Sequence, residues 1–268
     1  MSQSSLRYAL GVEYDGFGFS GWQTQQGQRT VQQELEAALS KVANHQINVV
    51  TAGRTDAKVH ATGQIVHFDT VAQRDLIAWH FGANRFLPDD IRVHWVVLVD
   101  SDFHARFTAI RRSYRYIIYN NNVKPCLLRH HVSYQYRKLN IEEMNLAAEH
   151  FLGEQDFTSI RAAGCQAKTA IRKVYDLCVY RSGDWVWFDV TADAFLQHMV
   201  RNIAGMLMSV GYGDENSLWA KDVLMAKDRT VAGVTAQPNG LYLTNVEYPQ
   251  RYTMGESPPK PIFWSANR

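Results

Sequence analysis

The sequence has little cysteine and no long apolar run. Its three cysteines, Cys126, Cys165 and Cys178, are an odd number without C-x-x-C spacing. This argues for free thiols in a reducing compartment and against a zinc site. No apolar run approaches the ~20 residues that a membrane helix needs. The N-terminus has no basic segment followed by an apolar stretch, so no signal peptide is expected. A cytoplasmic protein without membrane association is the expectation.

The charge balance is close to neutral and gives no sign of a partner by itself. The 28 lysines and arginines against 26 acidic residues leave a net charge of +2, too little to identify a nucleic-acid binder. Cations gather, however, in two short segments: Arg106, Arg111, Arg112 and Arg115, and then Arg161, Lys168, Arg172 and Lys173. Either cluster alone favours a solvated surface. Beside aromatic neighbours, the two together indicate a phosphate track with stacking platforms.

Hydrophobic periodicity and turn residues divide the chain into two similar halves. In the first half we expect strands at 6–14, 47–53, 63–70 and 91–100, and helices at 31–44 and 74–86. In the second half we expect strands at 105–120, 171–181, 185–193 and 240–248, helices at 140–153 and 194–211, and an additional short helix at 217–227. Thr30 and Asn140 are the expected N-caps of two of these helices.

The order β-α-β-β-α-β occurs in each half, which indicates an α+β protein built from two tandem split β-α-β halves. We expect the halves to share an antiparallel sheet, with helices on one face and an active-site cleft on the other. The expected boundaries are 1–100 for the N-terminal half, 101–249 for the C-terminal half, and 250–268 for a Pro-rich tail that contains Trp264.

The segment TAGRTDAKVHATGQIVHF, residues 51–68, sets one carboxylate between two strand-like runs. This is Asp56, two residues after Arg54. A loop aspartate most often satisfies nearby backbone amides, and Asp56 alone favours that use. A catalytic use needs a nearby cation and a cleft. No second acid stands close in sequence for two-carboxylate chemistry, and no metal-ligand spacing of histidines indicates a metal.

Two further segments allow more than one interpretation. In RRSYRYIIY, side chains alternate, so that Tyr114 and Tyr116 share one face of a strand while Arg115 lies on the other. The pattern fits a half-buried strand with aromatic pairs, and equally a platform on which a base stacks. In FLQHMVRNIAGMLM, Arg201 projects away from the apolar stripe, which is typical of a solvated helical arginine.

Six separated segments, taken in order, resemble one family. They are YDGFGFSGWQ, AGRTDAKVHATGQ, DFHARFTAIRRSYRYIIYN, GEQDFTSIR, HMVRNIAG and GLYLTNVEYP. The family is that of the tRNA pseudouridine synthases of the TruA type, and the resemblance extends from about Leu6 to Pro249. A lone GRTD would be a weak signal, whereas six ordered segments are specific.

The resemblance implies roles for five residues. Asp56 corresponds to the catalytic aspartate, Tyr114 to the tyrosine that stacks on the target uracil, and Arg201 to the basic residue that pairs with the aspartate. Arg54 corresponds to an arginine that enters the RNA stack where the uridine leaves it, and Leu243 to an apolar residue beneath the active site. We add Lys58, Arg112, Arg115 and Arg172 as candidate contacts to the RNA.

The resemblance also implies the reaction and the partners. The expected activity is isomerisation of uridine to pseudouridine at positions 38, 39 and 40 of the anticodon stem-loop, by an enzyme that flips the base out of its stem. Because substrate and product are isomers, no cofactor and no metal are expected. The expected partners are tRNA and a second copy of the chain, in a homodimer.

Two positions depart from the family pattern. Lys58 stands where the family's GRTDAGVH has glycine, and Ser113 stands where a basic residue is frequent. If the glycine serves a positive φ, lysine is strained there. If the backbone suits lysine, Lys58 adds a phosphate contact.

Two other functions remain as alternatives to the synthase. The first is a catalytically silent RNA-binding protein of the same fold, which would bind tRNA without isomerising it. The second is a carboxylate-dependent hydrolase of nucleosides or glycosides, which would need a second acid close to Asp56 in space.

Overall fold

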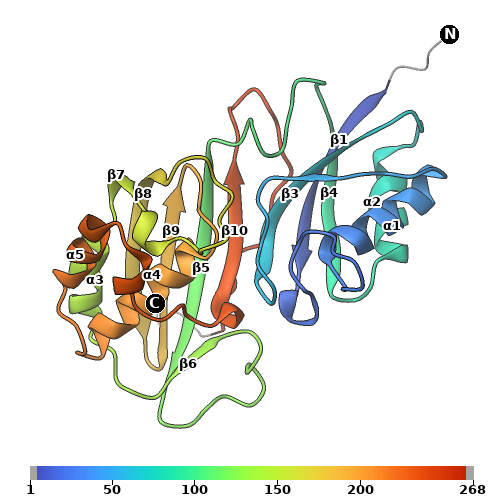
Figure 1. Cartoon of the computed structure of the whole chain (residues 1–268). Coiled ribbons are helices and arrows are strands. Elements are labelled where there is room, and N and C mark those ends of the chain that lie inside the picture. Colours follow the sequence, from blue (N-terminus) through green and yellow to red (C-terminus); the bar gives the residue numbers. More distant parts are fainter. Residues whose placement is uncertain (1–4, 264–268) are drawn as a thin grey trace. The chain divides into compact units, whose positions relative to one another are not determined.

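The computed structural model describes residues 5–263. The chain is a mixed α+β protein (Figure 1), which confirms the expected fold class. Its contacts group the described residues into two compact units, 5–110 with 242–261 and 111–241 with 262–263. The last strand of the chain therefore belongs mainly to the first unit, although it follows the second half in sequence.

The first unit contains four main strands in the order β4-β1-β3-β10. These are β1 (Leu6–Tyr14), β3 (His60–Thr70), β4 (Ile91–Val99) and β10 (Leu241–Glu247). The strand β1 pairs antiparallel with both β3 and β4, whereas β10 runs parallel to β3. A two-residue strand, β2 (Val50–Thr51), adds to β3.

Two helices, α1 (Val31–Ala43) and α2 (Leu76–Phe86), pack against each other and cover one face of this sheet (Figure 1). Buried aromatic rings of Tyr8, Phe68 and Trp79 form the core between α2 and the sheet, with ring centroids 5.0 to 5.6 Å apart. Burying such rings supplies much of the stability of a small core.

Thr30 is the N-cap residue of α1, as expected, but its side chain does not contribute to the cap. The helix begins directly after Thr30, but the Thr30 side chain makes no capping hydrogen bond. The first helical amides are satisfied by backbone instead, because Val31 N donates to Gly21 O at 3.3 Å and Gln32 N donates to Trp22 O at 3.0 Å. A preceding loop therefore caps this helix.

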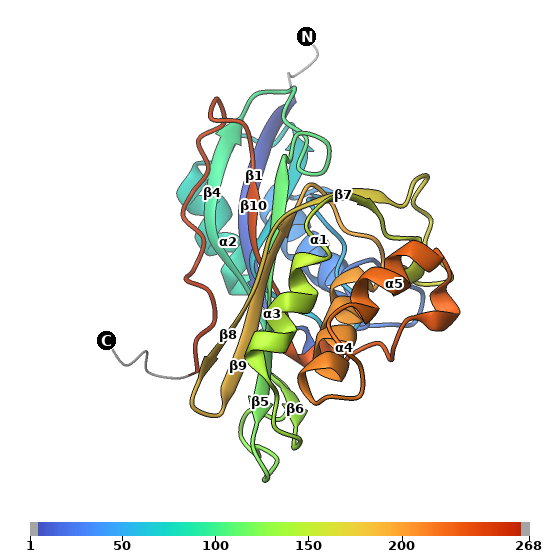
Figure 2. The ribbon, with the colours of Figure 1, turned by 90° about the vertical axis from the view of Figure 1, so that its left-hand side faces the viewer.

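The second unit has strands in the order β5-β9-β8-β7, with β6 parallel to β5. These are β5 (Arg111–Asn120), β6 (Ser133–Gln135), β7 (Gly153–Asp156), β8 (Ile171–Ser182) and β9 (Trp185–Ala192). Its helices α3 (Ile141–Glu149), α4 (Met199–Gly211) and α5 (Trp219–Ala226) lie on one face of the sheet (Figure 2). Within the part of the chain that the structure describes, no helix is long and apolar enough to span a membrane.

Several elements differ from their expected bounds, among them the helix expected at 140–153, which ends at Glu149, and three differ most. The strand expected at 105–120 begins at Arg111, because the preceding residues turn, with Thr108 N donating to His104 O at 3.0 Å. The helix expected at 194–211 begins at Met199, because His198 has φ of 63°, which no α-helix accommodates. The strand expected at 47–53 shrinks to β2.

Residues 250–261 of the C-terminal tail pack within the first unit. Tyr252 is buried against Phe103, with ring centroids 5.1 Å apart, and its hydroxyl donates to Asp102 Oδ1 at 3.1 Å. Gly255 lies so close to Trp95 that a Cβ there would stand 2.2 Å from the indole. Trp264 lies outside the described residues.

Asn140 and Thr30 provide a matched test of capping. The Asn140 side chain accepts hydrogen bonds from Glu142 N and Glu143 N at 3.0 and 3.3 Å, so Asn140→Ala should lower the free energy of unfolding by about 1 kcal/mol. The buried Thr30 hydroxyl has no partner within the described residues, so Thr30→Val should cost nothing or stabilise. Urea denaturation measures both, and an equal loss from the two variants would contradict this account.

Stability should also fall in mild acid because of His67. Burial lowers the pKa of His67 to about 4, and its Nδ1 accepts a hydrogen bond from Ala105 N at 3.1 Å. In the unfolded chain His67 binds a proton below about pH 6.5, whereas in the folded chain it stays neutral down to about pH 4. The free energy of unfolding therefore decreases as the pH falls from about 6.5 towards 4. His67→Asn should make unfolding free energy less dependent on pH across this range. If urea titrations give the same dependence of unfolding free energy on pH for His67→Asn and the wild type, this role of His67 is contradicted.

Candidate functional site

Asp56 lies in a short loop, residues 52–59, between β2 and β3 of the first unit; we call it the acid loop. One backbone hydrogen bond ties its start to the sheet, and another closes a turn at its end. Ala52 N donates to Ile65 O of β3 at 2.8 Å, and Val59 N donates to Asp56 O at 3.2 Å. The carboxylate is thus carried on a segment tied to the sheet.

A second loop, residues 15–22, holds the acid loop from the side, and we call it the clamp loop. Trp22 N donates to Thr55 O at 3.0 Å, and Lys58 N donates to Phe19 O at 3.2 Å. The backbone on both sides of Asp56 is therefore bonded to a second segment. Trp22 and Phe19 are themselves buried, which anchors the clamp loop in the core.

Glycine is required where the two loops touch. A Cβ on Gly16 would stand 2.0 Å from Val59 O, a distance that no real contact reaches. Gly21 has φ of +98°, and a Cβ there would stand 2.9 Å from Thr55 O. The glycines of the clamp loop thus allow its backbone to approach the acid loop closely.

Buried polar side chains support the acid loop from beneath. The Tyr14 hydroxyl and Thr55 Oγ1 are 2.8 Å apart, and Gln64 Nε2 donates to Gly53 O at 2.7 Å. Burial raises the pKa of Tyr14 to about 12, so the hydroxyl stays neutral and keeps its hydrogen bond at physiological pH. Sequence reasoning did not single out Tyr14 or Gln64, although both lie in segments that carry the family resemblance.

The side chains of the acid loop alternate in charge. Asp56 is half-buried, whereas Arg54 and Lys58 on either side are exposed. The Lys58 ammonium lies 5.6 Å from the ring of Phe17. Lys58 has φ of 65°, so the left-handed position that glycine would fill costs this chain about 1–2 kcal/mol.

A buried layer lies at the point where the acid loop enters β3. His60 is buried, its ring stacks on Tyr242 with centroids 4.7 Å apart, and its Nδ1 accepts from Gly16 N at 3.1 Å. The next residue pair of the parallel strands is Leu243 with Ala61, and Leu243 is fully buried. Leu243 is therefore part of the apolar support of the strand that follows the acid loop.

Tyr114 and Arg201 belong to the second unit. Tyr114 lies on β5 opposite Val190 of β9, is 7% exposed, and meets the ring of Phe195 edge-on at 5.0 Å. Arg201 lies in the first turn of α4, half-buried, and its Nε donates to Ala236 O at 2.9 Å. Both side chains are thus held by neighbours in their own unit.

The three other candidate RNA-binding arginines, all in the second unit, differ in how they are held. Arg115 forms a two-point ion pair with Asp189, each N–O distance being 2.8 Å. Arg112 Nη1 donates to the backbone carbonyl of Asp193, directly after β9, at 2.8 Å. Arg172 Nη1 donates to Thr169 O at 3.2 Å. Arg115 and Arg112 are nearly buried, whereas Arg172 is half-exposed.

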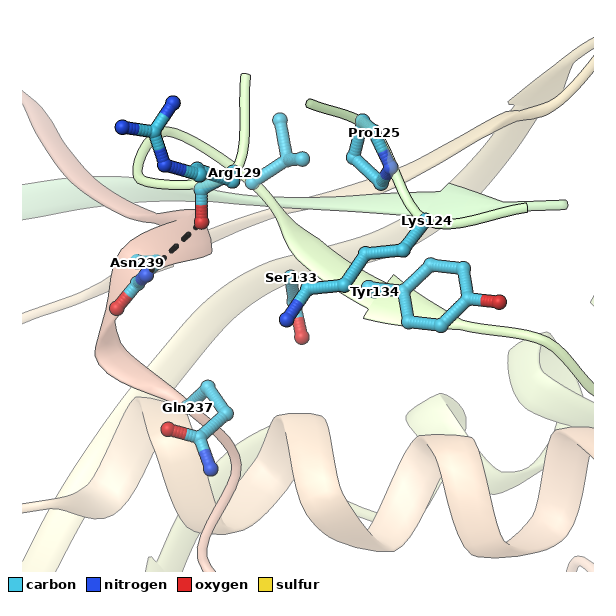
Figure 3. A pocket seen from close by; sticks show the side chains of 8 residues that line it. Lys124, Pro125, Arg129, Ser133, Tyr134, Gln237 and Asn239 are labelled. Atoms are coloured by element: carbon cyan, nitrogen blue, oxygen red, sulfur yellow. Dashed lines mark hydrogen bonds between the residues drawn. The ribbon is translucent and has the colours of Figure 1, made fainter. Parts of the chain in front are cut away.

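The second unit also contains a cavity of about 340 Å³ (Figure 3). Its lining residues are Lys124, Pro125, Arg129, Val132, Ser133, Tyr134, Gln237 and Asn239. The lining has two cations and no carboxylate, but the Arg129 guanidinium points away from the other labelled side chains. None of the candidate site residues lines it. Across residues 5–263, no three His, Cys, Asp or Glu side chains are grouped so that they could hold a metal ion.

The fit between the two loops can be tested with Gly16→Ala. The added methyl group would meet Val59 O, so the loops must separate, and we expect a loss of about 1–3 kcal/mol in unfolding free energy. Gly164→Ala is the control, because nothing lies within 4 Å of a Cβ there. Thermal or urea unfolding measures both. Equal stability of the two variants would show that the loops are not in tight contact.

Comparison with known proteins identifies the family. A family model described as tRNA pseudouridine synthase matches residues 11–108 and 147–249. The chain is 52% identical to tRNA pseudouridine synthase A of Tolumonas auensis over 261 residues, which cover 97% of this chain and 100% of that protein.

Two further relatives agree. The protein of the same name from Shewanella sp. (strain MR-4) is 52% identical over 258 residues, 96% of this chain and 99% of its own length. That of Coxiella burnetii (strain Dugway 5J108-111) is 49% identical over 257 residues, 96% and 98% of the two chains. Similarity at this level over nearly the whole length confirms the resemblance, and the chain belongs to the tRNA pseudouridine synthase family.

Proposed function

We propose that this chain isomerises uridine to pseudouridine in tRNA and that Asp56 is the carboxylate that acts on the target ribose. The proposal rests on the structure of the acid loop in a chain that belongs to this family. This loop holds a half-buried aspartate between two exposed cations, Arg54 and Lys58, on a backbone bonded from two sides. A rigidly held group of this kind can meet a reacting atom without first being ordered.

The chemistry requires only a carboxylate and acid–base steps. The N1–C1′ bond of uridine breaks, the freed uracil turns, and C5 bonds to C1′. The C5 proton then leaves, and N1 carries a proton in the product. Asp56 would either attack C1′ to form a covalent intermediate or remove the C2′ proton to open a glycal route. Substrate and product have the same atoms, so the balance needs no oxidant, reductant or co-reactant.

Tyr114 and Arg201 have proposed roles in the same reaction. Flipping a base from a stem costs a few kcal/mol, and stacking on Tyr114 would return about 1–3 kcal/mol. The edge contact with Phe195 holds the Tyr114 ring, and a flat aromatic face lets a uracil rotate in its plane. The proposed role of Arg201 is to keep Asp56 ionised and oriented.

The remaining candidate residues would position the RNA. Arg54 is proposed to enter the stack at the place that the uridine leaves, and Leu243 to support the site from its buried position. Arg172 is the best placed of the other arginines to bind phosphate, because it is half-exposed. Arg115 and Arg112 would have to share their present partners, Asp189 and a backbone carbonyl, with the RNA.

The finer features of the substrate and assembly are proposals too. Recognition by shape and phosphates suits an enzyme that accepts the neighbouring positions 38, 39 and 40 of the anticodon stem-loop, and mapping pseudouridine in product tRNA would test it. A homodimer is proposed, and sedimentation at micromolar concentration would distinguish it from a monomer. A cytoplasmic location fits a tRNA substrate and the three free cysteines.

Tritium release from C5-labelled uridine in an unmodified tRNA transcript tests the activity. The wild type should release tritium, because C5 loses its proton when it bonds to C1′. Asp56→Asn should lower the rate at least about 100-fold while tRNA binding persists. Asp75→Asn is the matched control, an exposed aspartate of the same unit, and should leave the rate unchanged.

The other outcomes are equally informative. Binding of tRNA by the wild type without tritium release would indicate the catalytically silent RNA-binding protein. Release of free uracil would indicate a hydrolase. Full activity of Asp56→Asn would refute the role of Asp56.

A further inference from the structure

Lys58 occupies a backbone position that favours glycine. Its φ is 65°, in the left-handed region that L-residues with a Cβ rarely adopt. Among the described residues, three others with side chains have positive φ, namely Asn44, His198 and Lys227. Asn44 and Lys227 each end a helix, where a left-handed residue has a structural use. Lys58 ends no helix and stands two residues from Asp56.

Contacts inside the protein do not account for lysine at this position. The Lys58 side chain is exposed, and within residues 5–263 its ammonium has no carboxylate partner. It approaches one face of the Phe17 ring at 5.6 Å, near the outer limit for a cation–π contact. The backbone N–H bond to Phe19 O would be made equally by glycine. In the part of the chain that the structure describes, no carboxylate contact offsets the strain at Lys58, which favours a use of its charge outside the chain.

The charge pattern of the acid loop indicates what that use is. Asp56 must approach a ribose that has a phosphate on either side, and its own negative charge repels both phosphates. Arg54 and Lys58 flank the acid in sequence, and both are exposed. A cation two residues from the carboxylate can reach a phosphate that lies a few bonds from C1′.

We infer that Lys58 binds a backbone phosphate next to the target nucleotide, and that its ammonium positions the RNA strand on the acid loop. The inference rests on the proposed function, since it takes an RNA strand as the ligand. Lys58 is then a positioning residue at which backbone strain and a phosphate contact, alternatives from the sequence, occur together. Whether position 58 holds lysine or glycine should therefore affect the affinity for RNA.

Lys58→Gly separates backbone strain from charge. The variant should melt at a higher temperature than the wild type, because glycine adopts positive φ without strain. It should bind tRNA about fivefold more weakly, and the slope of log affinity against log salt should decrease by about 1, as one phosphate contact is lost. Lys58→Arg should keep the wild-type salt slope, because the charge remains. Lys58→Asn should show the same decreased slope as Lys58→Gly, because asparagine tolerates the backbone but is neutral.

Lys227→Gly is the matched control for strain relief. Lys227 is also exposed with φ of 51°, and its ammonium lies 3.3 Å from Asp156 Oδ2. The substitution should leave tRNA affinity and its salt slope unchanged. In tritium release, Lys58→Gly should raise KM and change kcat little, whereas distortion of the acid loop would lower kcat.

Two results would overturn the inference. One is an unchanged salt slope in Lys58→Gly. The other is a Lys58→Gly variant that is more active than the wild type, which would show that Lys58 strains the backbone without aiding the reaction. Failure of the proposed function is distinguishable from both. If the wild type binds tRNA without tritium release while the slope still decreases in Lys58→Gly, the phosphate contact stands and the catalysis does not.

Discussion

The contact between the clamp loop and the acid loop is the constraint on which the first unit depends. Two backbone hydrogen bonds, Trp22 N to Thr55 O and Lys58 N to Phe19 O, join segments that are far apart in sequence. The same clamp loop gives its carbonyls to the first turn of α1. One short segment thus caps a helix, holds the carboxylate loop and requires glycine where the backbones touch. Loosening it would disturb the helix and the acid together.

This arrangement explains how a single acid can be useful on a loop. Loops are usually the mobile parts of a fold, yet a catalytic group must be held close to its productive geometry. Here the loop is short and tied to β3, and it rests on the neutral, buried Tyr14 and on Gln64. Arg54 and Lys58 remain exposed for the proposed contacts with RNA, while the backbone of the loop is fixed. Lys58 shows the cost of such a design, since its backbone is strained by about 1–2 kcal/mol.

Local patterns predict most of the elements but neither β6 nor β7, two short strands whose pairing partners lie elsewhere in the chain. The periodicity in 31–44 identified α1, and Asn140 was correctly recognised as a cap. Thr30 is the N-cap residue, but carbonyls of a loop some ten residues earlier accept from the first helical amides, which no local pattern predicts. The left-handed His198 delays α4 and leaves Phe195 to pack on Tyr114. For the site, the resemblance supplied the candidates, whereas the supporting Tyr14, Gln64 and His60 required the fold.

Hydrogen exchange at the amides of Trp22 and Lys58 tests the central claim most directly, because these two groups make the bonds between the loops. If the loops are held as described, both amides should exchange as slowly as amides in the middle of β1 and β3, through opening of the whole unit. Exchange of these two amides as fast as in an exposed loop would show that the acid loop moves independently of the sheet. The account of a pre-positioned Asp56 would then be wrong.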